Sequence, residues 1–240
     1  MDAEVEKFIG KFNAVVVEDC ERFIVFARGI EFQQEAVEKL ERLRSEILEI
    51  KIRVAKCGDN DSANFLLGLS CIPSALIEEL KMIIALKEDR ANDAWDNLIE
   101  AQDHVSTAIK AHDKFSYLEK YADKLSALEE LLFPRQSFCS PGMIVRESEC
   151  SICKQDYGEC DHIKGIAYMG ELCVRIIKKA EFRELSLVKN PANKHARALH
   201  FADKEGNRDM MTWRIKKETP EDPILSEREV EVTFPTNIPG

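Results

Sequence analysis

The spacing of apolar residues changes once along the chain, near residue 133, and this change limits the possible fold more than any other feature. From residue 2 to about residue 132, apolar residues recur every three or four positions, with charged residues between them. This spacing gathers them on one face of an α-helix. The clearest such face consists of Val37, Leu40, Leu43, Ile47, Ile50 and Val54.

The segments after Pro134 are short, and their apolar residues alternate with polar ones or form brief runs. Asn, Pro, Gly and Asp separate these segments, which is typical of β-strands joined by turns. We therefore predict an α+β protein in two parts. An α-helical hairpin or bundle with coiled-coil-like packing covers residues 1–133, and a small β-rich domain covers residues 134–240. A chain of 240 residues has room for two modest domains.

Two boundaries and one aromatic residue can be predicted within the helical part. The segment "KCGDNDSAN", residues 56–64, is rich in turn-forming residues and is predicted to be a loop. Pro73 and Ser74 are predicted to begin a helix, because proline is favoured at the first helical position. Trp95 lies beside a stripe of small residues between residues 91 and 108, and we predict that it packs at the edge of a helix–helix seam.

The charge of the chain narrows the range of partners. A net charge of -10 makes nucleic acid an unfavourable partner, because the field of the protein repels phosphate. The sequence opens without a signal-peptide pattern, and no apolar run approaches the roughly 20 residues of a membrane span. We predict a cytoplasmic protein without a membrane segment, whose amphipathic helices self-associate or bind a protein partner.

A cluster of cysteines and a histidine interrupts the second part of the chain, in the segment "ECSICKQDYGECDH". Eight cysteines are too few for a disulfide scaffold in a chain of this length, and clustered cysteines in a reducing compartment indicate metal. Cys150, Cys153, Cys160 and His162 supply the ligand types of a structural Zn²⁺ site, and four protein ligands leave no position for a catalytic water. Cys139 and Cys173 remain open as alternatives to His162.

A segment further along, "EFRELSLVKNPANKHARAL" (residues 181–199), resembles the strand-and-turn signature of tailed-phage prohead proteases, the capsid maturation enzymes. The match lies at residues 184–188, at 191–193 and at Ala196. In that family a serine nucleophile lies upstream of this signature, and "SPGM", residues 140–143, occupies a comparable place. The resemblance implies a phage- or prophage-derived protein with a related β-fold, and it makes Ser140 the candidate nucleophile.

Proteolysis also requires a histidine that takes the proton of the serine. The resemblance implies a histidine upstream of Ser140, where the sequence offers only His104 and His112, both in a segment predicted to be helical. We therefore interpret the β-rich part as a degenerate protease-like domain in a non-catalytic, zinc-binding interaction or assembly protein. A serine protease that uses Ser140 with His112, or with the downstream His195 or His200, is the first alternative.

The sequence raises two further hypotheses. A zinc-dependent regulator that binds nucleic acid is the second alternative, although the residues around the cysteine cluster lack the basic and aromatic interleaving of such surfaces. Glu100 and His104 lie four residues apart in a predicted helix, near Asp96 and Asp103. A di-iron site would require a second copy of this pattern, which the sequence lacks, so we predict a solvated polar face.

Overall fold

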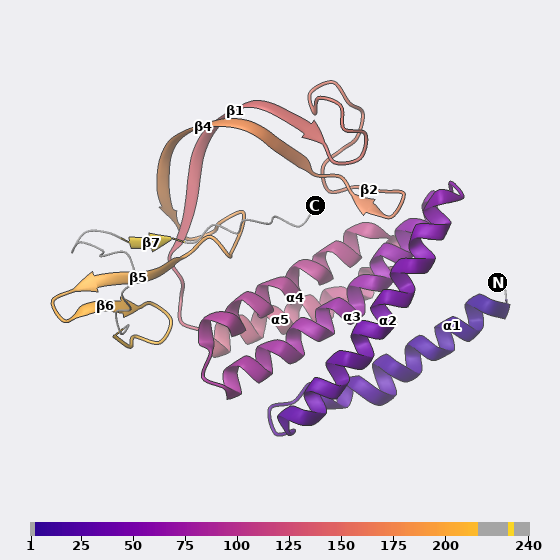
Figure 1. Ribbon diagram of the computed structural model, residues 1–240, viewed down its shortest axis with the longest axis horizontal. Coiled ribbons are helices and arrows are strands. Elements are labelled where there is room, and N and C mark those ends of the chain that lie inside the picture. Colours follow the sequence, from indigo (N-terminus) through magenta and orange to yellow (C-terminus); the bar gives the residue numbers. More distant parts are fainter. Residues whose placement is uncertain (1–2, 216–229, 233–240) are drawn as a thin grey trace.

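A computed structural model describes residues 3–215 and 230–232 of the chain, and it confirms the predicted α+β class (Figure 1). Five α-helices come first and small antiparallel sheets follow. The helices are α1 (Ala3–Asn13), α2 (Ile30–Lys56), α3 (Asn60–Lys87), α4 (Ala91–Ala111) and α5 (Glu119–Leu132). The strands are β1 (Phe138–Cys150), β2 (Ala167–Tyr168), β3 (Glu171–Leu172), β4 (Arg175–Val188), β5 (Ala198–Asp203), β6 (Gly206–Asp209) and β7 (Val230–Val232). Shorter helical turns, Ala14–Cys20, Glu21–Phe23 and Asp113–Leu118, join the helices.

Helix α3 is the centre of the bundle, with α2 and α4 packed against it. Its buried residues lie on every side of the helix, because neighbours cover it all round. In α2 the predicted stripe supplies Leu40, Leu43 and Ile47 to the core, all at most 1% exposed. The coiled-coil-like packing predicted for these helices stays a prediction.

The predicted helix start at Pro73 is wrong, because Pro73 lies in the interior of α3. The helix begins thirteen residues earlier at Asn60, where the side chain of Asp59 caps it by accepting a hydrogen bond from the backbone N–H of Ser62. An internal proline costs a helix roughly 3 kcal/mol. The burial of a long apolar segment between two neighbouring helices offsets this cost, and the hydroxyl of Ser74 donates to the carbonyl of Ser70 beside the proline.

Trp95 packs in the interior, as predicted, and its aromatic neighbours follow α5 and begin β1. Its side chain is 2% exposed and meets the ring of Phe133 edge-on, with 5.5 Å between the centroids. The ring of Phe138, at the start of β1, lies 6.0 Å from the Trp95 ring. Trp95 thus joins the end of the bundle to the first strand, since α5 ends at Leu132 and β1 begins six residues later.

Strands β1 and β4 form a long two-stranded antiparallel ribbon that arches over the bundle (Figure 1). The pairing runs from Phe138 opposite Val188 to Cys150 opposite Arg175, and bulges interrupt it in its middle. Every residue of β4 is exposed except Ile176, Ser186 and Val188, which are half-buried. The ribbon is therefore attached to the bundle at its ends and is open to solvent between them.

The loop between β4 and β5 forms the first of these attachments. The indole Nε1 of Trp95 donates to the carbonyl of Lys194, and the ammonium of Lys194 lies 2.6 Å from a carboxylate oxygen of Glu129. His195 faces Asp96 with 3.4 Å between Nδ1 and Oδ1. The sequence predicts a solvated polar face on α4, but this loop covers a part of that face. The three-stranded sheet in the order β6–β5–β7 follows it.

The substitution Gly68→Ala tests the packing of the bundle. A Cβ atom at Gly68 would overlap the ring of Phe115, which is 2% exposed and stacked on Phe65. Overpacking of this kind costs about 1–3 kcal/mol, so we expect a lower urea midpoint for unfolding. Gly10→Ala in α1 is the control, because nothing lies within 4 Å of the added atom. Equal midpoints for the two variants would contradict the packing described here.

Candidate metal centre

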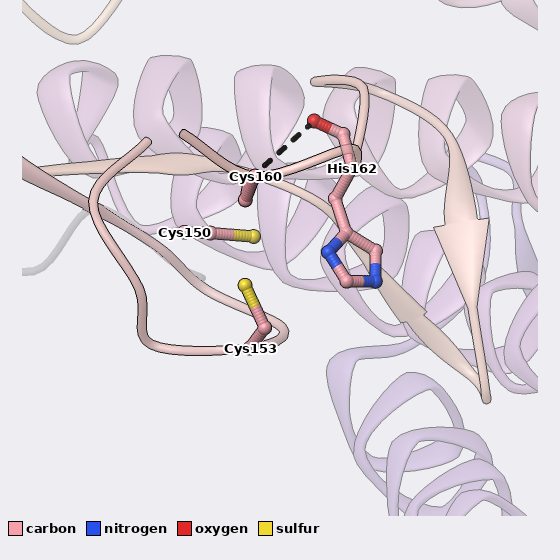
Figure 2. Close-up of side chains that lie close together, drawn as sticks. All are labelled: Cys150, Cys153, Cys160 and His162. Atoms are coloured by element: carbon pink, nitrogen blue, oxygen red, sulfur yellow. Dashed lines mark hydrogen bonds between the residues drawn. The ribbon is translucent and has the colours of Figure 1, made fainter. Parts of the chain in front are cut away.

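The four predicted ligands lie together at the end of the ribbon (Figure 2). Cys150 is the last residue of β1, Cys153 lies in the turn that follows, and Cys160 and His162 belong to the loop before β2. Their three Sγ atoms and one imidazole nitrogen all lie within 4.8 Å of one another. Within residues 3–215 and 230–232, no other group of three or more metal-ligating side chains is this close.

The first two ligands are brought together by a tight turn. The backbone N–H of Lys154 donates to the carbonyl of Cys150, and the N–H of Cys150 donates to the carbonyl of Gln155, both at 2.9 Å. Lys154 has a φ of 61°, a left-handed conformation that reverses the chain directly after Cys153. The backbone N–H of Ile152 points at the Sγ of Cys150 at 3.4 Å. The turn therefore presents two thiols to one point and supplies a donor that stabilises a thiolate.

The second pair of ligands lies in a loop that is held by two tyrosines. The hydroxyl of Tyr168 accepts from the N–H of Ile163, and the hydroxyl of Tyr157 accepts from the N–H of Lys164, both at 3.1 Å. The ring of His162 packs edge-on against Tyr168, with 4.6 Å between the ring centroids. These contacts fix the backbone of the two residues that follow His162, and the ring of His162 points toward the thiols (Figure 2).

The imidazole of His162 offers one specific ligand atom. Its Nδ1 atom is buried and has no hydrogen-bond partner. Figure 2 shows this side of the ring facing the sulfur atoms of Cys150 and Cys153. A buried polar nitrogen without a partner is costly, and coordination of a cation would satisfy it. The donor set therefore fits a metal ion that is bound by three sulfur atoms and one nitrogen.

The electrostatics of the thiols also fit a cation. Burial raises the pKa of Cys150, but hydrogen bonds from the backbone N–H groups of Cys153 and Ile152 and from neighbouring thiols outweigh it and lower the pKa to about 6. Burial raises the pKa of Cys160, and burial together with the adjacent Cys150 raises the pKa of Cys173 to about 11. One thiolate thus suppresses ionisation of its neighbours, and a bound cation would remove this repulsion.

The alternative ligands Cys139 and Cys173 lie in different places. Cys139 is eleven residues before Cys150 on the same strand, opposite Leu187 at the far end of the ribbon. Cys173 lies beside the cluster, with its Sγ 3.7 Å from the Sγ of Cys150, but it does not belong to the mutually close set of four. The geometry therefore favours His162 over both as the fourth ligand.

Polar residues of the bundle hold the cluster region in place, and they form the second attachment of the ribbon. The side-chain amide of Asn64 donates to the carbonyl of Ala167 at 3.0 Å and accepts from the N–H of Gly170 at 2.9 Å. Asn60 accepts from the N–H of Met169, and Lys51 donates to the carbonyl of Gly170. The β2–β3 hairpin is thereby docked where α2 ends and α3 begins.

Sequence reasoning missed this attachment, because residues 56–64 are predicted to be a loop, whereas α3 begins at Asn60. Once the helix start is known, Asn60 and Asn64 lie four residues apart on one face of its first turns. Which backbone groups they bind depends on the hairpin that follows the cluster, about 100 residues later. No local pattern carries that information.

The candidate catalytic residues Ser140 and His112 are not brought together. Ser140 lies within β1 opposite Ser186, two residues after Phe138, which packs on Trp95. His112 follows the last residue of α4, so about 25 Å of helix separates it from Trp95. Its Nε2 faces Asp61 at 3.3 Å, and its Nδ1 accepts from the backbone N–H of Lys114. Ser140 and His112 are therefore too far apart for a proton to pass between them.

In the described part of the chain, no helix has both the length and the apolar character needed to cross a membrane. Comparisons with protein-family models, with curated proteins and with solved structures found no match to this chain.

The substitution Asn64→Ala tests the attachment of the cluster region to the bundle. Asn64 is only 9% exposed and makes two hydrogen bonds to the hairpin, so its removal leaves a buried carbonyl and a buried N–H unpaired. We expect a loss of about 2 kcal/mol in the free energy of unfolding, measured by urea denaturation. Asn60→Ala is the control, because it removes one exposed hydrogen bond. A larger loss in the control would contradict this account.

Proposed function

We propose that the protein is a non-catalytic assembly protein whose β-ribbon is stapled by one structural Zn²⁺ ion. The observation that carries this proposal is the cluster of Cys150, Cys153, Cys160 and His162 at the end of the ribbon next to the β2–β3 hairpin. Three thiolates and one imidazole in a tetrahedral set are the ligands that Zn²⁺ prefers in structural sites. Such a set leaves no open coordination position, so the metal would stabilise the fold and would not activate a water molecule.

The cluster region needs this metal crosslink, called the staple below, because it has little core of its own. In the loop that carries Cys153, Cys160 and His162, none of the residues 152–166 is buried. A structural Zn²⁺ ion supplies on the order of 10 kcal/mol of folding free energy to small domains. The ion would therefore order this loop, and through the β2–β3 hairpin it would fix the end of the ribbon on the bundle.

The ribbon provides the surface for assembly. Among the described strands, β4 pairs only with β1, so its outer edge offers unpaired backbone groups. Six large apolar residues of the ribbon are also exposed, which makes the edge a favourable place for association. They are Met143, Ile144, Ile177, Phe182, Leu185 and Leu187.

We propose a second copy of this chain as the partner at this edge. Two copies of β4 that pair antiparallel about a two-fold axis between Glu181 and Phe182 place Lys179 of each strand opposite Glu184 of the other. The charges are then complementary on both sides of the axis, as an isologous interface requires. The sequence predicts contact through the helices instead, and the experiment below separates these two surfaces.

The resemblance of residues 181–199 to phage prohead proteases supports an origin in phage capsid assembly, which we retain as a part of the proposal. The serine protease alternative has little support, because Ser140 faces Ser186 across the ribbon and His112 is bound to Asp61 at the far end of α4. The nucleic-acid alternative has little support too, because the net charge is -10 and the ribbon carries both signs of charge.

Metal analysis of the purified protein tests the staple. We expect about one Zn²⁺ ion per chain, lost in Cys153→Ser together with protease resistance of residues 150–173, while the helical circular dichroism signal persists. Cys57→Ser is the control, because Cys57 is an exposed cysteine outside the cluster. Folded wild-type protein without any bound metal would overturn the staple.

Light scattering tests the assembly surface. We expect a mass above that of the 27.4 kDa monomer, reduced to the monomer in the double variant Phe182→Ser/Leu187→Ser. Both side chains are at least 65% exposed, so the variant should fold. Leu131→Ser, at an 80% exposed position of α5, is the matched control. Loss of the oligomer in that control alone would assign the contact to the helices, and a monomeric wild type would refute self-assembly.

A further inference from the structure

Cys173 is a fifth potential ligand at a site that needs four. Its side chain is fully buried, and its Sγ lies 3.7 Å from the Sγ of Cys150. The four mutually close donors are completed by His162 and do not include Cys173. A free thiol in contact with a metal-bound thiolate can act in one of three ways: as a replacement ligand, as a hydrogen-bond donor to the thiolate, or as inert packing.

Hydrogen bonds hold the backbone around Cys173 in place beside the cluster. The N–H of Cys173 donates to the carbonyl of Ile166 at 2.9 Å, and its carbonyl accepts from the N–H of Gly165 at 2.8 Å. The next residue, Val174, makes two hydrogen bonds with Ser151, the residue that follows Cys150. Its N–H donates to the hydroxyl of Ser151 at 2.9 Å, and its carbonyl accepts from the N–H of Ser151 at 3.0 Å. The backbone of Cys173 therefore cannot shift toward the centre of the cluster without breaking these pairs.

The position of the thiol favours the second of these roles, a hydrogen-bond donor to the thiolate. His162 already points a buried, unpartnered nitrogen at the cluster, so the fourth coordination position has an occupant. Cys150 is at once a ligand in the set and a sulfur that Cys173 contacts, at 3.7 Å. Cys150 also accepts from the backbone N–H of Ile152, so a second donor would extend an existing pattern of hydrogen bonds to its sulfur.

We propose that Cys173 is a positioning residue of the metal site, whose S–H group donates a hydrogen bond to the Cys150 thiolate when the ion is bound. This inference rests on the proposed metal site. A donor to a coordinated thiolate fixes its orientation and reduces its electron donation to the metal. Removing an outer partner of a metal ligand typically lowers the affinity for the metal by about 10-fold to 100-fold.

The experiment compares Cys173→Ala with Cys173→Ser and His162→Ala in the full-length protein, with Co²⁺ as a spectroscopic probe and chelator competition for the Zn²⁺ affinity. We expect Cys173→Ala to lose about 10-fold in Zn²⁺ affinity, while its thiolate-to-cobalt charge-transfer band keeps the intensity of three thiolates and shifts to lower energy. Cys173→Ser keeps a donor and should restore both the affinity and the band position. His162→Ala should lose the tetrahedral cobalt spectrum.

Cys139→Ala is the matched control, because Cys139 is a buried cysteine at the opposite end of the same ribbon. It should leave the affinity and the cobalt spectrum unchanged. Loss of one thiolate from the charge-transfer intensity in Cys173→Ala would show that Cys173 is a ligand, and an unchanged affinity and band would show that it only packs. Either result overturns the positioning role but leaves the metal site intact, whereas a wild-type protein that binds neither ion would refute the metal site itself.

Discussion

A two-stranded ribbon cannot support itself in water, and the rest of this structure depends on how that problem is solved. An isolated antiparallel pair is marginally stable at best, because it buries too little apolar surface. Here β1 and β4 extend over thirteen and fourteen residues, and nearly all of β4 is exposed. The ribbon is ordered because the bundle holds both of its ends, so the bundle serves as a base for the ribbon.

The two attachments depend on different interactions, aromatic packing at one end and hydrogen bonds at the other. At one end Trp95, Phe133 and Phe138 pack as a group of aromatic rings continuous with the core of the bundle, and this contact resembles ordinary domain packing. At the other end the side chain of Asn60 accepts a hydrogen bond from the β2–β3 hairpin, and the side chain of Asn64 donates one to it. Polar contacts of this kind require a hairpin of defined shape. The cysteine and histidine cluster is the feature that can give the hairpin that shape, because the loop lacks an apolar core.

Much of this arrangement could be predicted from the sequence, and the reasons for success and failure differ by residue. The helical stripe of α2 and the cluster of Cys150, Cys153, Cys160 and His162 could be predicted because each is encoded by local spacing. The interior position of Pro73 could not, because its cost is offset by burial against helices that are distant in the sequence. The roles of Asn64 and Lys194 depend on contacts across 103 and 65 residues, respectively, and no local pattern carries them.

Residues 181–199 have a structural role of their own in this fold. Their first half completes β4, where Ser186 faces Ser140, and their second half is the loop whose Lys194 and His195 bind the acidic side chains of α5 and α4. A serine protease needs a histidine within hydrogen-bond reach of its nucleophile, and a carboxylate orients that histidine. In this chain His195 is engaged with Asp96, His112 with Asp61, and His162 with the thiol cluster. The contact between His195 and Asp96 ties the loop after β4 to the bundle, so this histidine has a structural role that does not depend on catalysis.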